Sequence, residues 1–445
     1  MIELLSTNVI LKTKIYKNGR ALVLRNVISV IIISILFPSI LILATNFHVT
    51  EVKAPNGYPV HNLDTWLNYI TIQEAINAPE TSNGHTIFVD EGIYYEHVTV
   101  NKSLMLHGEN RGTTIIDGNM TGDVVTITQD HVNVTGFTIQ RSGGEGTLIK
   151  AGIYLSSTSY CNIFGNRLVD NYVGIFGSPR NTSMSNNTIT NNHVGVDIHH
   201  QATYNIISGN CLMANTVSIH IYNADSNSIF ENNMTNNWRS ITLGYSRNNR
   251  FYHNVFFNNT EQVLILASGY ANFWDDGYPS GGNFWSEYTD ADLSHDGIGD
   301  STFILDADNT DNFPLVGAFS EFDITSEYSA QVICNSSISD FQFNSTAISF
   351  NVTGEDGTTG FCRICIPTAL MNDSFRVFVN GTEILPSPEP LPCSNSTHSY
   401  LYFNYSHSTQ EVIIIPEFPS LIILPIFMTA TLLATKIYRK SKSKH

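Results

Sequence analysis

One pattern of apolar and polar positions recurs five times between Ala151 and Thr260. Each copy opens with an apolar–polar alternation, as in VSIHIY at Val217–Tyr222, and continues through turns rich in Asn, Gly and Ser. Alternation of period 2, bounded by such turn residues, predicts short β-strands. One apolar position keeps its register in all five copies, at Ile153, Ile175, Val196, Ile219 and Ile241.

Two series of asparagines mark the turns of the repeat. The first series advances in steps of 21, 23, 22 and 22 residues, and the second follows it five residues later in each copy. Asn tolerates left-handed turn conformations and its side-chain amide forms hydrogen bonds, so we expect these residues to bond from one copy to the next and to be structural. The series are Asn166, Asn187, Asn210, Asn232 and Asn254, and Asn171, Asn192, Asn215, Asn237 and Asn259.

A repeat of this length cannot bury its apolar face alone. Stacked coils, about 4.8 Å apart like strands in a sheet, bury the apolar residues as continuous columns. A propeller or a β-sandwich would need longer repeats or hairpin turns, and this region has neither. The repeat therefore predicts an all-β solenoid.

The chain resembles the right-handed parallel β-helix proteins of the pectin-lyase-like superfamily. Within that superfamily it is similar to the repeats shared by carbohydrate-binding proteins and sugar hydrolases (CASH) and to the NosD copper-maturation family. The resemblance covers roughly residues 71–315 and includes the opening segment Thr71–Gly118, where it implies an amphipathic helix that caps the first coil. It also includes the closing segment Gly282–Leu315. The implied fold is a right-handed parallel β-helix with coils of about 22 residues.

The sequence predicts that the chain is divided into four parts. The alternating strands after the solenoid, such as SFRVFVNGTEIL at Ser374–Leu385, predict a small β-sandwich-like module. The predicted parts are a basic leader with a signal peptide or signal anchor at 1–54, the β-helix at 55–317 (cap at about 65–80, regular coils at about 123–265, closing segment at about 266–317), the β-rich module at 318–415, and a PEF motif, transmembrane helix and basic tail at 416–445.

Both ends of the chain have an apolar run flanked by basic residues, Val27–Thr45 after the leader and Leu421–Thr435 before the tail. The positive-inside rule places the basic ends in the cytoplasm and the middle outside the cell. The first run is either a cleaved signal peptide or a signal anchor. The motif PEFPS at Pro416–Ser420 is similar to that of archaeal surface proteins processed by an archaeosortase. N-x-S/T sequons, the acceptors of N-glycosylation, lie between the two runs, among them those at Asn186 and Asn233. We therefore expect a glycosylated protein of the cell membrane, with the bulk of the chain extracellular.

Charge limits the choice of partners. The 445 residues have a formal net charge of −17, and only 14% of them are charged. No basic stripe is available to neutralise phosphates, so nucleic acid is excluded as a partner. The expected partners are the membrane and a cell-surface polysaccharide or surface-layer protein.

Alternation places one set of polar and aromatic residues outward on the first strand of each coil. Rings can stack on sugars and the polar groups can bond to hydroxyls, and imidazole with carboxylate can also bind a divalent metal. We expect ligand binding without catalysis at this surface, the alternative being a solvated aromatic face. The candidate ligand-binding residues are Tyr154, Asp197, His199, His220 and Tyr222. The register of the repeat places Asp197 beside His220, and His199 beside Tyr222, on adjacent coils.

Two other functions stay open. One is a polysaccharide-degrading lyase or hydrolase with an atypical site, although the carboxylates of the coils are few and scattered: Asp170, Asp197, Asp225 and Glu231. The other is a NosD-like copper-binding accessory protein, periplasmic or extracellular, which the resemblance implies. Four histidines are close in the sequence, and imidazole suits copper: His193, His199, His200 and His220.

The loop Asp290–Asp300 resembles the first part of an EF-hand loop. Oxygen-bearing side chains occupy positions 1, 3, 5 and 9, and Gly297 follows at the sharp turn, which favours a calcium ion. Phe303 stands where the bidentate Glu would be, so we expect weak binding, and the alternative is a turn that only closes the β-helix. The candidate ligands are Asp292, Ser294, Asp296 and Asp300.

The six cysteines fall into two groups. Outside the cell, the four in the β-rich module are expected to form disulfides, with three possible pairings. The other two are expected to be unpaired core residues. The groups are Cys334, Cys362, Cys365 and Cys393, and Cys161 and Cys211.

Overall fold

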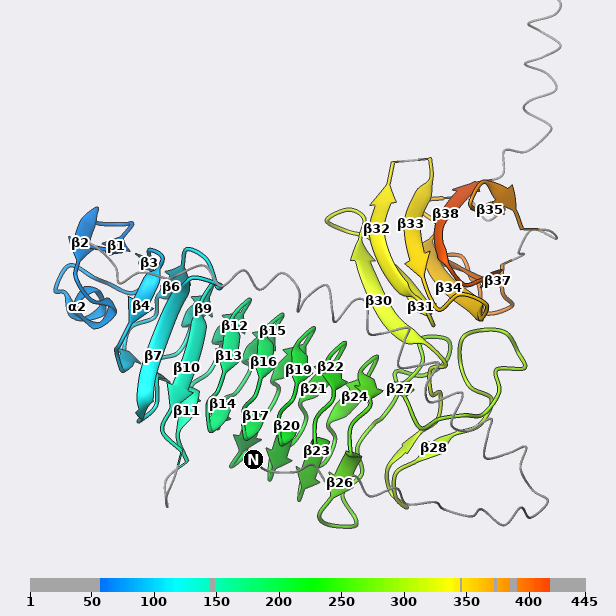
Figure 1. Ribbon diagram of the computed structural model, residues 1–445. Helices are drawn as coiled ribbons and strands as arrows, with labels where there is room; N and C mark the ends of the chain where they lie inside the picture. Colours follow the sequence, from blue (N-terminus) through cyan, green and yellow to red (C-terminus); the bar gives the residue numbers. More distant parts are fainter. Residues whose placement is uncertain (1–56, 145–148, 345, 372–373, 385–389, 417–445) are drawn as a thin grey trace, which may run out of the picture.

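The computed structural model describes residues 57–144, 149–344, 346–371, 374–384 and 390–416. In these ranges the chain is a row of stacked coils followed by a separate β-module beside the last coils (Figure 1). The observed fold is the predicted parallel β-solenoid, because the coils pair through parallel strands from Thr86 onward.

Three sheets form the walls of the solenoid, and each coil adds one strand to each. Sheet A contains, in spatial order, β2 (Leu67–Tyr69), β1 (Val60–Asn62), β3 (Thr86–Val89), β6 (Met105–Gly108), β9 (Asn133–Thr135), β12 (Asn162–Phe164), β15 (Ser183–Ser185), β18 (Ile206–Ser208), β21 (Ser228–Phe230) and β24 (Arg250–Tyr252). Sheet B contains β4 (Gly92–Tyr94), β7 (Thr114–Thr121), β10 (Thr138–Ser142), β13 (Arg167–Val169), β16 (Thr188–Thr190), β19 (Cys211–Met213), β22 (Asn233–Thr235), β25 (Val255–Phe257) and β27 (Phe284–Trp285). Sheet C contains β5 (Val98–Val100), β8 (Val125–Ile127), β11 (Ala151–Leu155), β14 (Val173–Gly177), β17 (Val194–His199), β20 (Val217–Tyr222), β23 (Arg239–Gly244) and β26 (Glu261–Ile265).

The N-terminal cap closes the first coil. Strands β1 and β2 pair antiparallel, and β1 pairs antiparallel with β3. Helix α2 (Ile72–Asn77) begins at Thr71, whose Oγ1 accepts a hydrogen bond from the backbone N–H of Glu74 at 3.1 Å. Its apolar side, with Ile72 and Ile76, is buried against the first strands. The helix of the opening segment is therefore present, and it is 6 residues long.

A single hydrophobic cluster fills the solenoid from Val60 in β1 to Trp285 in β27. The repeated apolar position forms the expected column, because Ile153 and its four equivalents are fully buried. At the far end, aromatic rings close the core: Phe251 stacks on Trp274 with centroids 4.2 Å apart, and Phe256 stacks on Trp285 at 4.1 Å. These rings replace the aliphatic column where the coils stop.

The two predicted series of asparagines are buried ladders inside the turns. In the first ladder, Asn232 Oδ1 accepts hydrogen bonds from the backbone N–H and side-chain amide of Asn210, at 3.1 and 2.9 Å. In the second, Asn237 Oδ1 accepts from the same two groups of Asn215, at 2.9 and 3.2 Å. Each side chain thus accepts the backbone N–H of the equivalent Asn in the preceding coil, so the hydrogen bonds run from coil to coil as predicted.

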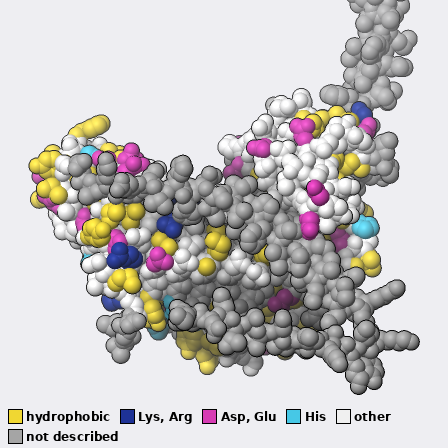
Figure 2. Space-filling view, viewed as in Figure 1, with side chains coloured by type: hydrophobic (Ala, Val, Ile, Leu, Met, Phe, Trp, Pro, Cys, Tyr) yellow, Lys and Arg dark blue, Asp and Glu magenta, His cyan; other side chains and the backbone are white. Residues whose placement is uncertain are grey.

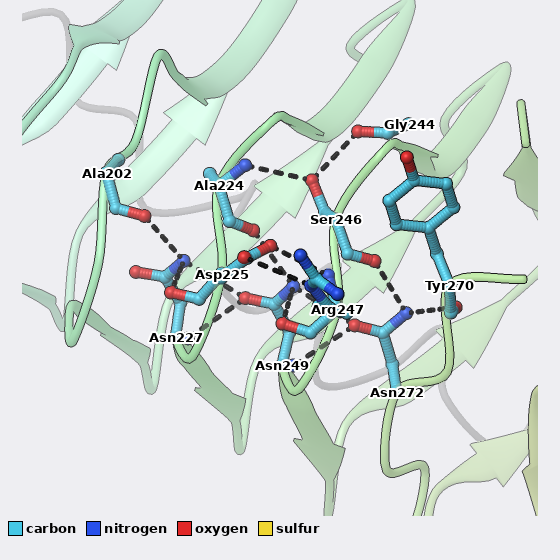
Figure 3. Close-up of polar contacts among 10 residues, drawn as sticks. All are labelled: Ala202, Ala224, Asp225, Asn227, Gly244, Ser246, Arg247, Asn249, Tyr270 and Asn272. Atoms are coloured by element: carbon cyan, nitrogen blue, oxygen red, sulfur yellow. Dashed lines mark hydrogen bonds and ion pairs between the residues drawn. The ribbon is translucent and has the colours of Figure 1, made fainter.

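A third ladder, which the sequence reasoning missed, lies between sheets C and A (Figure 3). Asn227 donates its backbone N–H to Asn249 Oδ1 at 2.9 Å, and Asn249 donates to Asn272 Oδ1 at 3.0 Å. The preceding member is Asn205. Its signal is the same spacing, because these residues follow one another at 22, 22 and 23 positions.

After the solenoid, β28 (Phe303–Ile304) and β29 (Thr310–Asp311) form a small hairpin within the closing segment. The C-terminal module then consists of two antiparallel sheets around a core of its own. One contains β30 (Ala318–Asp323), β31 (Ser329–Cys334), β34 (Thr359–Pro367) and β37 (His398–Ser406); the other contains β32 (Ser337–Phe343), β33 (Ile348–Thr353), β38 (Thr409–Pro416), β35 (Phe375–Val379) and β36 (Thr382–Glu383). The module contacts the last coil, where Phe319 stacks on His253 with centroids 3.7 Å apart.

The cysteines differ from the disulfide prediction, since all six are free thiols. Cys334 and Cys362 are register partners on β31 and β34 inside the core of the module. The sulfur of Cys334 lies 3.2 Å from the Tyr405 hydroxyl and accepts from the backbone N–H of Ser336 at 3.3 Å. Hydrogen bonds and burial hold the Cys334 thiol in place, and Cys362 beside it is fully buried.

The predicted membrane runs Val27–Thr45 and Leu421–Thr435 lie outside the described residues. Within the described ranges, no helix is long and apolar enough to cross a membrane.

Candidate functional site

The outer surface of sheet C holds the candidate ligand-binding residues. In β20 the alternation turns Ile219 and Ile221 into the core and leaves His220 and Tyr222 outside. Neighbouring coils repeat this arrangement in register. We call this surface the aromatic face; it comprises Tyr154, Phe176, Asp197, His199, His220, Tyr222, Tyr245 and Tyr270.

The structure brings the five predicted residues onto one surface. Asp197 is the register partner of His220, and His199 is the register partner of Tyr222. Tyr154 lies two coils before Asp197, with Phe176 between them in the same column. The predicted adjacency of both pairs is therefore present.

Rings follow one another along the aromatic face. Tyr154 and Phe176 stack with centroids 5.6 Å apart, and Phe176 contacts His199 at 4.7 Å. Further along, Tyr245 contacts Tyr222 at 5.4 Å and Tyr270 at 5.7 Å. Aromatic pairs prefer these stacked and edge-on arrangements. The result is two short runs of rings, joined where Asp197 meets His220.

Tyr245 and Tyr270 are additional members of the aromatic face that were not predicted from the sequence. Both lie just beyond strands of sheet C, where the alternation ends and the register cannot be extended by counting. Tyr245 is 46% exposed, and its backbone is in the left-handed region with φ of 51°. Its signal is a Tyr 23 residues after Tyr222, close to the repeat length.

Asp197 is the only carboxylate in the middle of the aromatic face. Its Oδ1 lies 3.1 Å from Nδ1 of His220, an ion-pair distance at an angle that makes no hydrogen bond. Oδ1 and the Nε2 of His199 are both buried without a hydrogen-bond partner among the described residues. Burial lowers the pKa of His199, and the charge of Asp197 opposes that shift. Because Asp197 and the Nε2 of His199 are buried, the aromatic face presents mainly ring surfaces to solvent, among them the exposed Tyr222.

The remaining coil carboxylates are elsewhere. Asp170 is in the turn after β13, Asp225 pairs with Arg247 at 3.6 Å between sheets C and A, and Glu231 faces the C-terminal module. At the edge of sheet C, Glu261 accepts from Arg239 Nε at 2.7 Å. A lyase or hydrolase of this fold needs clustered carboxylates at its site. The described part of the aromatic face has one such group, so its geometry gives no support to catalysis.

The histidines do not fit a copper site. His199 and His200 have ring centroids 4.0 Å apart, but His193 stacks on Tyr172 at 4.9 Å, away from them. Among the described residues, no three His, Cys, Asp or Glu side chains converge as metal ligands. Copper binding by these residues stays a prediction.

The loop before Asp300 is closed by its own hydrogen bonds. Asp292 accepts the backbone N–H groups of Asp296 and Gly297 at 3.0 and 2.9 Å, and Asp296 accepts that of Ile298 at 3.0 Å. Ser294 donates to Asp292 at 3.2 Å, and Asp300 accepts from the backbone of Leu293. These carboxylates act as turn acceptors, and calcium binding here stays a prediction.

Residues 77–290 match the family described as "Periplasmic copper-binding protein (NosD)". The β-helix is of the NosD type. A cell surface glycoprotein of Methanothermus fervidus is 36% identical to the chain over 115 residues. The match covers 26% of this chain and 18% of that protein, so the chain spans less than a fifth of the relative it matches.

Solved structures similar to the chain, with its NosD-type β-helix, are distant. An alginate lyase from Paenibacillus sp. str. FPU-7 is 14% identical, covers 48% of this chain and 94% of its own, and has a TM-score of 0.35. A pectin methylesterase from Yersinia enterocolitica is 13% identical, covers 46% and 81%, and has a TM-score of 0.26. At these values neither structure assigns an activity or a ligand to the NosD-type β-helix.

Proposed function

We propose that this chain is a cell-surface protein whose NosD-type β-helix binds a neutral polysaccharide on the aromatic face without catalysis. The observation that supports binding is the two runs of rings on adjacent coils, which include Tyr154–Phe176 and Tyr222–Tyr245. The Tyr ring can stack on the apolar face of a sugar ring, and the Tyr hydroxyl can form hydrogen bonds with the sugar hydroxyls.

The proposal of a neutral ligand rests on charge. The chain has a net charge of −17, which repels polyuronates and other polyanions at a distance. On the aromatic face Asp197 adds a negative group beside His220. A neutral glucan or chitin chain meets no such repulsion.

The proposed location rests on two observations. The relative named as a cell surface glycoprotein shares 115 residues with this chain, and the sequence has apolar runs with basic flanks at both ends. An exposed solenoid held at the cell surface would present its outer face to envelope polysaccharides. Partners of the whole protein are part of the same proposal.

The test measures binding of the full chain to a soluble β-glucan, soluble chitin oligomers and polygalacturonate. Tyr222→Ala should weaken binding to the glucan or the chitin oligomers about ten-fold, since a stacked ring in an interface contributes on the order of 1.4 kcal/mol. The matched control is Tyr204→Ala, because Tyr204 is 65% exposed but lies outside the aromatic face. Binding to none of the neutral sugars, or equal losses in both variants, would contradict the proposal.

A further inference from the structure

The N-terminal cap exposes a set of large apolar side chains that its fold does not use. Between β1 and α2, Trp66 is 84% exposed, and its neighbours Leu63, Leu67 and Ile70 are 44, 42 and 57% exposed. Tyr58, just before β1, is 62% exposed. We call these five residues the cap patch. Hydrophobic side chains gather over the cap in the space-filling view (Figure 2).

Hydrogen bonds hold the loop that contains Trp66 in one conformation. Asn62, fully buried, accepts the backbone N–H groups of Asp64 and Thr65 at its Oδ1, at 3.1 and 3.2 Å, and donates to Thr81 at 2.8 Å. The backbone N–H of Trp66 bonds to the carbonyl of Asn62 at 2.9 Å. The buried side chain of Asn62 therefore holds the loop that keeps Trp66 exposed.

Trp66 also has a backbone conformation that is unfavourable for a bulky residue. Its φ is 62°, in the left-handed region where a large side chain is an outlier. Residues held in such regions cost free energy and persist where the surroundings fix them. Core packing offers no compensation here, because the buried residues of the cap are others, among them Val60 and Ile72.

The sequence indicates what covers the patch. Gly57, the first described residue, is 12 residues after Thr45, where the apolar run Val27–Thr45 ends. A fully extended chain of that length reaches at most about 43 Å, so the cap stays close to whatever holds the run. Trp and Tyr are the side chains enriched at membrane interfaces. The one acidic group of the loop, Asp64, is turned to the protein and accepts the N–H of Thr86 at 2.7 Å.

We propose that the apolar run is retained as a signal anchor and that the cap patch inserts into the interfacial layer of the membrane around it. Trp66 enters to the level of the lipid headgroups, with Leu67 and Ile70 beside it. The cap then rests on the membrane surface and fixes the orientation of the solenoid relative to it. This contact is separate from polysaccharide binding on sheet C.

Tryptophan fluorescence can test the contact in the full chain. Of the four tryptophans, Trp274 and Trp285 are fully buried and Trp238 is 50% exposed. In Trp238→Phe, Trp66 is thus the only exposed tryptophan. The protein is reconstituted into phosphatidylcholine vesicles with and without dibrominated acyl chains, and Trp66→Phe in the same background supplies the emission to be subtracted.

The proposal predicts that brominated acyl chains quench the Trp66 emission by about half. In unbrominated vesicles the emission should shift to the blue, and aqueous acrylamide should quench it less than in detergent. Acrylamide access in vesicles equal to that in detergent, without bromine quenching, would overturn it. Protection from acrylamide that grows with the protein-to-lipid ratio, without bromine quenching, would also overturn it and would indicate a second copy on the patch.

Discussion

Asn210 lies one coil after Asn187, and its Oδ1 accepts two hydrogen bonds from that residue: one from the backbone N–H at 2.9 Å and one from the side-chain amide at 3.1 Å. Its own amide donates to the carbonyl of Met184 at 2.8 Å. A single side chain thus satisfies backbone groups of the preceding turn while it continues the ladder. This relationship, repeated along three edges, holds the coils in register.

Asn210→Leu should lower the free energy of unfolding by about 1–3 kcal/mol, because buried backbone groups of the neighbouring turn lose their partner. The measurement is chemical denaturation of the full chain in detergent. Asn404→Leu is the control, since Asn404 is exposed on β37. Equal stability of Asn210→Leu and wild type would show that the ladder contributes nothing net.

Glu231 should make stability depend on pH. Burial, together with the carboxylates of Glu321 and Asp323 on the C-terminal module, raises the pKa of Glu231 from 4.5 to about 7. The unfolded chain therefore releases this proton at lower pH than the folded chain. The stabilisation is present below pH 4.5 and is lost as the pH rises through about 7.

Replacing Glu231 by Gln removes this titration. Thermal melts between pH 4 and 8 should show a shallower fall in melting temperature for Glu231→Gln than for wild type across that window. Glu80→Gln, at an exposed site beyond α2, should leave the slope unchanged. Parallel curves for wild type and Glu231→Gln would contradict the carboxyl contact between the solenoid and the module.

Asp197→Asn should lower the pKa of His199 further. Burial already depresses this pKa, and the charge of Asp197 is the contribution that opposes it. A depressed histidine pKa means that stability is lost as the pH falls, so the variant should lose more of it below about pH 6.5. Histidine NMR titration, assigned with His199→Gln, measures the shift. Asp225→Asn is the control, and an unchanged or raised His199 pKa in Asp197→Asn would refute the coupling.

Asp292→Ala should destabilise the protein both with calcium and with a chelator. Asp292 accepts two backbone N–H groups of the closing loop, so its removal leaves them without a partner, at a cost of about 1–3 kcal/mol. Thermal melts in millimolar calcium and in EDTA measure it. A loss seen only with calcium would instead support the EF-hand-like prediction. Ser294→Ala, which removes a donor to the same carboxylate, is the milder comparison.

The sequence alone determined the solenoid and its regular contacts. Neighbouring coils interact at a fixed separation of about 22 residues, so apolar columns and asparagine ladders are visible as periodic positions. The same regularity placed Asp197 beside His220 and His199 beside Tyr222 before any coordinates. It also held the signal of the third ladder, Asn205 to Asn272, which counting could have found.

Only the tertiary structure decided the contacts without a period. Glu231 meets Glu321, 90 residues later, because the C-terminal module docks on the last coils, and no repeat relates the two parts. The outward position of Trp66 depends on a turn built around buried Asn62. The state of the cysteines likewise follows from packing: Cys334 faces Cys362 across two strands, yet hydrogen bonds to Tyr405 and Ser336 hold its thiol. Such contacts depend on how whole elements pack, which local patterns do not encode.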